Sequence, residues 1–513
     1  MIACKTRPCQ TSPHPVDAMI FSPFQATGPR LQRHGAHCLA LLLCGGNLVA
    51  NAADILRSPD TDAALAYEFT AADEALLEEV QHGCFNYLWN AVGEPAGLAR
   101  DRRTTKVAST AGVGFQLSAL PVGVKHGWIT RAEGEQRALS ILRALLARSD
   151  NKHLGVYLHF VMPEDASQPP GDLVDQASTV DHALLLAGAL PAATYFGGEV
   201  ARLVDQMAAD TNWRAYDVSE RGLISFGWRP NDGRSMGGEG DFRPWDWHIA
   251  CAEDQIVYFL AAGAPNEDYA VDAGDWYRLE RVVKSHNDGP EFVVSWNSAL
   301  FTYFFSHSWI DYRRFEADNP ADFDLDGPRV DWVENSRRAV LTHRQRCIEQ
   351  SERFKTLGPN RWGLSPCMGL NAEGRDSYLV QAVRPNQSNE DNFCGGTVAP
   401  YAAGSSIVFA PRECVAALHA MRNLRGDDGQ LLAWQDPSEG GYGFVDSFNL
   451  DQQHASDDNI AIDVGPMILA IENARTGLLW KLFMQHHVAR RAVEKLKWVE
   501  RADAGGNVSH GEE

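Results

Sequence analysis

The most constraining feature of the sequence is one almost wholly apolar run, DHALLLAGALPAATYF, at residues 181–196. A helix that is apolar on every side has no face to turn toward water, so other elements must enclose it. The run therefore predicts a fully buried helix inside a large core. We expect further helices to surround it.

Helical signals recur along the rest of the chain. Thr70 with Asp73 opens a helix with an apolar face, and Thr130 with Glu133 forms a capping box before another. Further helices are predicted at residues 108–124, 199–210, 253–262, 293–312, 330–349, 411–424, 466–483 and 488–499. Sustained strand alternation is absent from the sequence, although Leu154–Val161 and Gly222–Trp228 are candidates for short strands. This pattern predicts an all-α fold of paired helices.

The composition limits the classes of partner. The chain has 513 residues, 44% of them hydrophobic, and a formal net charge of −21. An acidic surface disfavours nucleic acid and anionic membranes as main partners, and it is compatible with a neutral glycan. The ten cysteines contain no CxxC pair. Buried free thiols are therefore expected.

The N-terminal region has the layout of a secretory signal. A short apolar run, Cys38–Cys44, follows Arg30 and Arg33 and leads to the cleavage pattern Ala50-Asn51-Ala52. Elsewhere in the sequence, apolar runs are too short to span a bilayer. We expect an exported protein, periplasmic or secreted, without a membrane span.

One stretch, residues 241–264, combines indole rings with carboxyl groups. Trp245 and Trp247 precede Glu253 and Asp254, which stand at the entry of an apolar helix. Indole faces stack on the C–H faces of sugar rings, and a poorly hydrated carboxyl keeps its proton to higher pH. The alternative is a helix N-terminus with favourable acidic residues beside ordinary core tryptophans.

Other carboxyl groups stand before predicted helices or in loops. They are Asp172, Asp175 and Asp181 ahead of the apolar run, Glu390 and Asp391 in SNEDNFCGGT, Asp446 in GYGFVDSFN, and Asp463 in AIDVGP. Structural alternatives stay open: Asp181 as a helix cap, Asp446 ordering its loop, and Asp463 capping a helix that begins near Pro466. His307 has the alternative of a core histidine. The sequence contains neither a His cluster with metal spacing nor a G-x-S-x-G elbow, so we expect no metal and no cofactor. Carboxylates among many Trp and Tyr fit glycoside hydrolysis.

Several motifs together resemble one known family. The segments are GLARDR, TAGVGFQLSALPVGVKHGWITR, STVDHALLLAGAL, ISFGWRP, AEDQIVYFLAAGAP, FSHSWIDYR, RWGLSP, YGFVDSFN and AIDVGPMILAIENARTGLLWKLF. The chain is similar to the bacterial glucoamylase-like domain proteins, a group that includes endo-β-1,2-glucanases. The resemblance covers roughly residues 72–485 and implies an (α/α)6 barrel whose long loops form the rim of an acidic pocket. Residues 1–53 would then be an N-terminal extension and signal, 54–71 a linker, and 486–513 a C-terminal helix and disordered tail.

The resemblance implies roles for individual residues. Glu253 and Asp181 match the family's acidic positions, and we expect Glu253 to be the general acid. A base would come from Asp181, Asp391 or Asp446. The predicted substrate-binding residues are Asp101, Arg102, Asp175, Gln176, Trp228, Trp245, Trp247, His307, Trp362, Tyr442 and Asp463.

The chain also departs from the family pattern. Gln176, Gly395 and Val464 stand where relatives usually have Glu, Asp and Gln, and the segment Glu390-Asp391-Asn392 could supply a shifted carboxylate. An insertion at Leu370–Gln387 would remodel the rim of the cleft. The first hypothesis is an exported hydrolase of a glucan, foremost β-1,2-glucan. The alternatives are a non-catalytic carbohydrate-binding protein on the same barrel and a hydrolase of another bacterial exopolysaccharide. We expect a monomer or a weak homo-oligomer.

Overall fold

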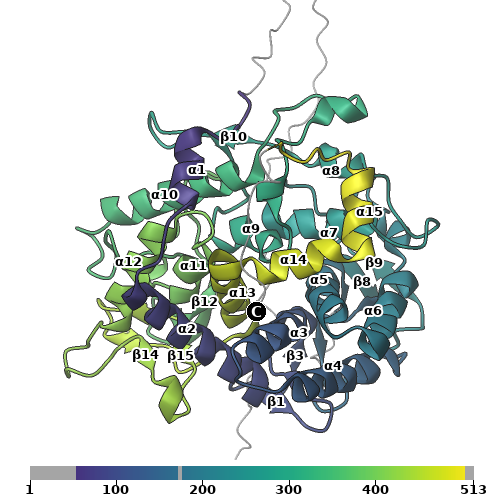
Figure 1. The fold of residues 1–513 in the computed structure, drawn as a ribbon, viewed down its shortest axis with the longest axis horizontal. Helices are drawn as coiled ribbons and strands as arrows, with labels where there is room; N and C mark the ends of the chain where they lie inside the picture. Colours follow the sequence, from purple (N-terminus) through teal and green to yellow (C-terminus); the bar gives the residue numbers. More distant parts are fainter. Residues whose placement is uncertain (1–52, 172–175, 503–513) are drawn as a thin grey trace, which may run out of the picture. The chain divides into compact units, whose positions relative to one another are not determined.

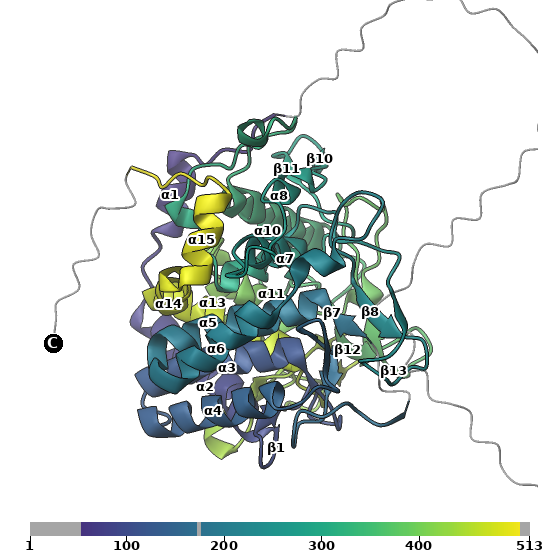
Figure 2. The same cartoon turned by 90° about the vertical axis from the view of Figure 1, so that its right-hand side faces the viewer.

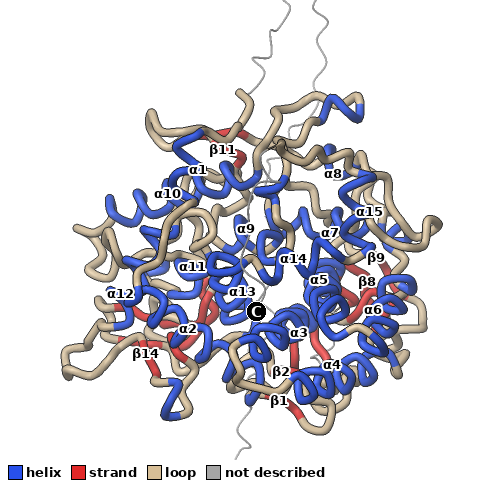
Figure 3. Tube along the Cα trace, in the orientation of Figure 1, coloured by secondary structure: helices blue, strands red, loops and turns tan. Residues whose placement is uncertain are grey.

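The structure is a computed structural model that describes residues 53–171 and 176–502. In this part the chain is mostly helical, which confirms the predicted all-α class. Figure 3 shows the helices joined by long loops that contain only short strands. The predicted secretory signal, Asp172 and Asp175 lie outside the described residues.

The helices account for most of the regular structure. Their bounds are α1 Pro59–Leu65, α2 Ala71–Asn90, α3 Thr110–Lys125, α4 Arg131–Leu146, α5 Thr179–Phe196, α6 Gly198–Asp210, α7 Ala252–Ala262, α8 Asp275–Arg278, α9 Phe301–Phe304, α10 Trp332–Glu349, α11 Pro400–Ser405, α12 Pro411–Arg422, α13 Ala461–Thr476, α14 Leu478–Gln485 and α15 His487–Lys495. The helix start predicted at Thr70 and the capping box predicted at Thr130 are both present, and in each the hydroxyl accepts from the backbone N–H three residues on.

The strands are two to four residues long and pair antiparallel. Their bounds are β1 Val92–Gly93, β2 Leu98–Ala99, β3 Ala108–Ser109, β4 Lys152–His153, β5 Val156–Tyr157, β6 Phe160–Val161, β7 Ala177–Ser178, β8 Gly227–Pro230, β9 Gly240–Phe242, β10 Val283–Lys284, β11 Phe292–Val293, β12 Cys367–Leu370, β13 Asp376–Leu379, β14 Trp434–Gln435, β15 Gly443–Phe444, β16 Phe448–Asn449 and β17 His454–Ala455. The only three-stranded sheet among the described residues has the order β7-β8-β9, and the other strands form hairpin-like pairs such as β12-β13. These pairs brace the loops between helices.

Six helices lie on the inside of the helical arrangement: α3, α5, α7, α9, α11 and α13. Packing runs from α13 to α3, α5, α7 and α9 in turn, and α11 packs on α13. Figure 1 shows these helices around the middle of the view, with α2, α4, α6, α10 and α12 outside them. The apolar run predicted to be buried on all sides is α5, and nearly all of its residues are buried.

The close packing of α3 against α5 depends on glycine. A Cβ on Gly188 would stand 1.9 Å from the backbone oxygen of Gly114, so no larger residue fits without moving one helix. The Ser118 hydroxyl donates to the Gly188 oxygen across the same contact (2.9 Å). Close backbone approach therefore sets the spacing of the two helices at the centre of the core.

The inner helices share an orientation that places their N-termini at one end. Strand β3 runs directly into α3, and β7 runs directly into α5. Figure 2 shows β7, β8, β12 and β13 gathered at one end of the helices, with α14 and α15 on the opposite side. Side chains in the first turns of α5, α7 and α13 are therefore brought to the strand-bearing end.

Two predicted helices are wrong in their extent. Over 293–312 the structure has the end of β11, a loop, the short α9 and a 3₁₀ turn at Ser306–Ser308. A continuous helix is interrupted because Ser298 adopts a positive φ of 51° and the side chains of Ser295 and Asn297 accept from backbone N–H groups. The predicted helix 466–483 is instead two helices, α13 and α14, which Gly477 separates with a φ of 68°.

Two expectations about composition can be checked in the described part. Its six cysteines are free, and all except Cys394 are buried, as predicted. Among the described helices, none is both long enough and apolar enough to cross a membrane.

Candidate functional site

Two predicted catalytic carboxyl groups lie in the first turns of neighbouring helices. Asp181 belongs to α5 and Glu253 to α7, and these helices pack together. Burial, followed by the nearby charges of Asp254 and Asp181, raises the pKa of Glu253 well above its usual value. Ser178 donates to Asp181 through its hydroxyl, so Asp181 is held in place rather than capping its own helix. The structure therefore brings Glu253 and Asp181 within electrostatic reach.

Asp254 anchors the entry to α7. Its carboxylate accepts from the Ile249 backbone N–H (2.9 Å) and from the Cys251 thiol (3.1 Å). Burial raises the pKa of Asp254 to about 7, and it raises the pKa of the Cys251 thiol well above its usual value. The adjacent Glu253 side chain is thus carried on a backbone whose path is fixed by a buried acid.

A second pair of carboxyl groups is formed by Asp463, in the first turn of α13, and Asp446, in the loop between β15 and β16. Both side chains are buried, and the Met368 N–H donates to Oδ2 of Asp446 (2.6 Å). Burial raises the pKa of Asp446 to about 6, and burial with the Asp446 charge raises the pKa of Asp463 well above its usual value. Two buried carboxyl groups in contact hold one proton between them near neutral pH.

The GLARDR loop closes over this pair. The Arg102 guanidinium lies 5.1 Å from the centre of the Tyr378 ring and 2.9 Å from the Met368 sulfur. Burial remains the dominant cause of the raised pKa of Asp446 and Asp463, and the positive charge of Arg102 partly offsets it. The Asp101 oxygen accepts from the Ala461 N–H at the first residue of α13 (2.8 Å). Four predicted site residues, Asp101, Arg102, Asp446 and Asp463, are therefore brought together.

Sequence reasoning missed two tyrosines in this cluster. Tyr378 lies on β13, inside the segment interpreted only as an insertion, and Tyr401 lies in the first turn of α11. Tyr401 donates to the Pro366 oxygen (2.9 Å), and its hydroxyl also contributes to lowering the pKa of Asp463. The alternation of DSYLV could have indicated a strand with Tyr378 on one face, but no motif indicated a contact with Arg102.

Asp391 has a different environment from the other predicted catalytic residues. Arg346 and Arg384 donate to the same oxygen of its carboxylate, at 2.9 and 2.8 Å. The two guanidinium groups and the Arg384 backbone N–H hold the pKa of Asp391 below its usual value against the effect of partial burial. A carboxylate engaged by two cations is a poor acceptor for a proton from water, so the structure favours Asp181 or Asp446 over Asp391 as the base.

Three predicted sugar contacts are buried in side-chain packing. Trp228 is 3% exposed, because His153 stacks on its ring at 3.8 Å and the Gly240 backbone covers it closely. Trp362 is fully buried. His307 is a core histidine whose Nε2 bonds to the Ser336 hydroxyl, and burial lowers its pKa to about 3. Packing contacts account for the placement of these three side chains.

The other predicted binding residues differ in exposure. Trp247 is buried, and its indole N–H donates to the Thr179 hydroxyl at the start of α5 (2.8 Å), so it positions the helix that carries Asp181. Gln176 is also buried. Trp245 lies under the Arg243 guanidinium and remains partly exposed, as does Tyr442.

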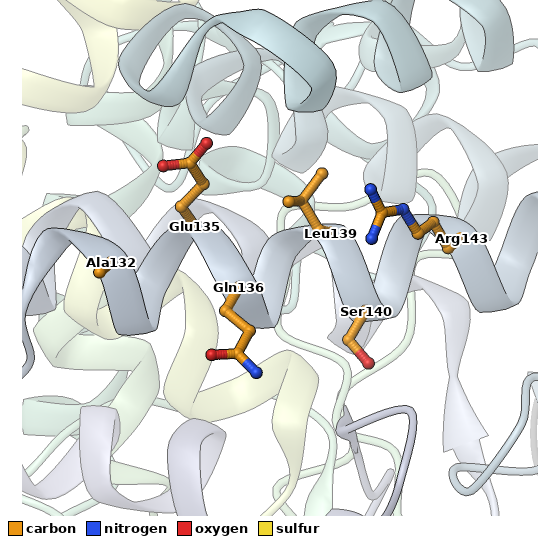
Figure 4. A pocket seen from close by; sticks show the side chains of 6 residues that line it. All are labelled: Ala132, Glu135, Gln136, Leu139, Ser140 and Arg143. Carbon is orange, nitrogen blue, oxygen red and sulfur yellow. The ribbon is translucent and has the colours of Figure 1, made fainter.

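One surface hollow lies on α4, away from these acids. Its volume is about 520 Å³, and Figure 4 shows that its lining side chains all project from α4. They are Ala132, Glu135, Gln136, Leu139, Ser140 and Arg143. A shallow depression along one outer helix lacks the converging groups that catalysis needs.

Two groups in the described part have ligand-type atoms close enough for a metal ion, namely Cys251-Glu253-Asp254 and Asp205-His486-His487. In the first, the buried thiol donates to Asp254 and is a poor ligand without ionisation. In the second, Nδ1 of His486 accepts from the Val488 N–H, which favours a proton on the nitrogen that faces Asp205. The existing hydrogen bonds explain both groups.

Comparison with known proteins confirms the family resemblance. Residues 244–487 match the family described as "Putative glucoamylase". The chain is 27% identical over 487 residues to an exo-β-1,2-glucooligosaccharide sophorohydrolase (non-reducing end) of Parabacteroides distasonis. That match covers 86% of this chain but only 60% of the relative, so the chain spans about three fifths of the length of this curated protein.

Solved structures show the same fold. A putative glucoamylase of Bacteroides uniformis aligns with a TM-score of 0.68 and 25% identity, covering 84% of this chain and 99% of that one. An endo-β-1,2-glucanase of Chitinophaga pinensis, solved with sophorotriose and glucose, aligns with a TM-score of 0.67 and 23% identity, covering 83% and 98%. The helical arrangement is therefore shared along nearly the whole length of both neighbours.

Proposed function

Because residues 244–487 match this glucoamylase family, we propose that the chain is an exported glycoside hydrolase that cleaves a glucan, foremost β-1,2-glucan. The observation that carries the proposal is the pairing of Glu253 and Asp181 at the first turns of α7 and α5. The alternation of inner and outer helices supports the further proposal that they form an (α/α)6 barrel.

The chemistry follows from the different environments of the two carboxyl groups. Glu253, with its raised pKa, is protonated near neutral pH and donates its proton to the glycosidic oxygen as the bond to the anomeric carbon breaks. Asp181 accepts a proton from a water molecule whose oxygen forms the new bond to that carbon. Positive charge that develops on the sugar ring is stabilised by the nearby carboxylates.

The Arg102 cluster has a separate task in this proposal. A guanidinium presents several N–H donors in one plane, which suits the hydroxyl groups of a sugar. The Asp446–Asp463 pair lies near the Arg102 guanidinium and supplies negative charge to it. The Tyr378 ring covers one face of the same guanidinium. Arg102 would therefore orient a sugar ring while Glu253 and Asp181 act on the linkage.

The direct test is product analysis after incubation of the protein with linear β-1,2-glucan and with other α- and β-glucans. Wild-type protein should release short oligosaccharides from β-1,2-glucan. Glu253→Gln should reduce kcat by at least about 100-fold while binding is retained, because the amide keeps the shape but cannot donate an acidic proton. Turnover close to wild type in Glu253→Gln would remove this residue from the mechanism.

A second candidate is a carbohydrate-binding protein without catalysis. It is favoured by Gln176, a buried amide at a position where the family usually has a carboxylate. This candidate predicts oligosaccharide binding by folded protein without product release from any glucan. Release from a decorated exopolysaccharide, but not from β-1,2-glucan, would instead indicate the third option, a hydrolase of another polymer.

A further inference from the structure

Trp296 differs from every other tryptophan in the described part by its exposure. Its side chain is 40% exposed, and it is the only tryptophan among the large hydrophobic residues that face solvent there. Within the described residues, neither a ring nor a cation is paired with its indole. Burial of an indole in contact with a ligand is favourable, so a solvent-exposed indole can contribute free energy to ligand binding.

The backbone that carries Trp296 is rigid. Ser295 and Asn297, on either side, are almost fully buried. The Tyr303 hydroxyl accepts from the Ser295 N–H (3.1 Å), and the Asn297 amide donates to the Gln381 oxygen (3.0 Å). The Trp296 oxygen itself accepts from the Ser388 N–H (3.2 Å). An exposed aromatic residue between anchored neighbours loses little entropy when it binds a ligand.

The position of Trp296 relates it to the carboxylate site. It lies between β11 and α9, and α9 packs against α7, whose first turn carries Glu253. The exposed Val380 lies next to Gln381, the residue that Asn297 bonds. Trp296 thus stands on the rim of the strand-bearing end of the inner helices.

The same hydrogen bond limits the distance to the Arg102 cluster. Tyr378 and Gln381 are three residues apart, so at most about 10 Å of extended chain separates them. The Asn297 side chain and its hydrogen bond add at most about 9 Å between the two backbones. The backbone near Trp296 therefore lies within roughly 20 Å of Tyr378, close enough for one extended oligosaccharide to reach both.

We propose that Trp296 is an outer sugar-binding platform, on which one glucosyl residue of a bound glucan stacks beyond the residues at the cleaved bond. The inference rests on the proposed function because it takes its ligand from it. A pyranose ring presents an apolar C–H face that matches the free face of an indole. Trp296 makes the protein select chain length, since only an oligosaccharide that extends past the cleavage site reaches the platform.

The test compares Trp296→Ala, Trp296→Phe and wild type on β-1,2-linked oligosaccharides of increasing length. In Trp296→Ala, kcat/KM should fall about ten-fold more for long chains than for the shortest cleaved one, a ratio equivalent to the loss of one stacking contact. Trp296→Phe should recover most of the loss because it keeps an aromatic face. Val499→Ala, another exposed apolar position, is the matched control and should leave the profile unchanged.

Several outcomes would overturn the inference. An equal loss at all lengths would assign Trp296 to folding or to the reacting ring, and no loss would make the exposed indole incidental. Calorimetric binding of the same oligosaccharides to Glu253→Gln and to the Trp296→Ala/Glu253→Gln double variant covers the case in which wild type shows no turnover. If wild type shows no turnover but Trp296→Ala weakens binding more for longer chains, the proposed hydrolase activity is rejected and the role of Trp296 as a sugar-binding platform is retained. A change of oligomeric state in Trp296→Ala, without an effect on glycan binding, would show that the indole contacts a second copy of the chain.

Discussion

The two ends of α13 carry buried carboxyl groups whose pKa values move in opposite directions. Asp463, in the first turn, is 2% exposed, and its pKa is raised well above its usual value. Glu472, near the other end, has no exposed surface, and its pKa is lowered far below its usual value. The same helix and the same degree of burial therefore produce a proton-retaining acid at one end and a permanent anion at the other.

The difference lies in the donors around each carboxyl group. Glu472 accepts from Lys125 (2.6 Å) and Thr476 at one oxygen, and from Gln81 (3.1 Å) at the other, where it also bonds Nε2 of His126 (2.9 Å). Asp463 faces another acid, Asp446, and one of its oxygens lacks a hydrogen-bond partner among the described residues. Saturated donors are typical of an anion that stabilises the fold, and an unsaturated acid pair is typical of a functional site.

The largest effect on stability is expected for Glu472→Gln. Removing this buried anion leaves Lys125 without its counter-charge and His126 with only the more exposed Glu78. The free energy of unfolding should fall by about 3 kcal/mol, the lower limit for a buried pair, because Lys125 is partly exposed. Urea denaturation measures this change. Glu78→Gln removes a more exposed partner of the same His126 and should cost much less. Equal losses in the two variants would contradict the central role of Glu472.

Asp463→Asn should change stability little and activity strongly. The amide replaces a carboxyl group that is already protonated near neutral pH, so the free energy of unfolding should change by less than about 1 kcal/mol. Activity should fall about 100-fold, because the shared proton is lost and Arg102 changes its position. Thermal unfolding and kcat/KM on the cleaved glucan measure the two effects. A loss of stability as large as that of Glu472→Gln would remove the distinction between the two ends.

The free energy of unfolding, measured against pH, should depend on the carboxyl groups at both ends of α13. The pKa of Asp446 is raised in the folded state from 3.8 to about 6, so its stabilising contribution is complete below 3.8 and is lost as pH rises through about 6. The pKa of Glu472 is lowered from 4.5, so its contribution is present above 4.5 and is lost as pH falls below it.

Urea denaturation of wild type across the acid range should therefore show losses on both sides of an optimum. Asp446→Asn should flatten the loss on the side of rising pH, and Glu472→Gln should flatten the loss on the side of falling pH. Identical pH curves for wild type and both variants would show that other groups govern acid stability.

The smallest effect is expected for Glu74→Gln, at the edge of the Glu472 network. Glu74 accepts from Arg475 (2.7 Å), but 42% of its side chain is exposed to solvent. Water and salt screen such a pair, so the free energy of unfolding should fall by less than about 1 kcal/mol. The effect should shrink further at high salt, and a salt-independent loss would place Glu74 in the buried network.

Local signals in the sequence were sufficient for much of the helical pattern. The capping boxes at Thr70 and Thr130 depend on residues three positions apart, and the burial of α5 follows from its composition. The predicted helix at 293–312 was wrong because the Ser295 N–H donates to the Tyr303 hydroxyl and the Asn297 side-chain amide donates to the Gln381 backbone oxygen, contacts that only the folded loop provides. Short-range chemistry was readable from the sequence, and contacts with distant loops were not.

The candidate site divides in the same way. Glu253 and Asp181 were predicted from their places before apolar helices, and the family motifs indicated Arg102, Asp446 and Asp463. Their carboxyl partners were not predictable, because a pKa depends on every donor and charge within a few ångströms. The same limit applies to Trp228, which His153 covers, and to Trp296, which nothing in its own segment distinguishes as exposed.

The sequence by itself determined the helical class, the fully buried centre and the helix starts that carry the acids, because these depend on periodicity and on neighbours within one turn. Only the tertiary structure decided which carboxyl groups lie in contact, which tryptophan side chains are buried and which one remains exposed. Those properties depend on packing between segments far apart in the chain. Burial and hydrogen bonding, rather than residue type, therefore separate Asp463 from Glu472 on one helix.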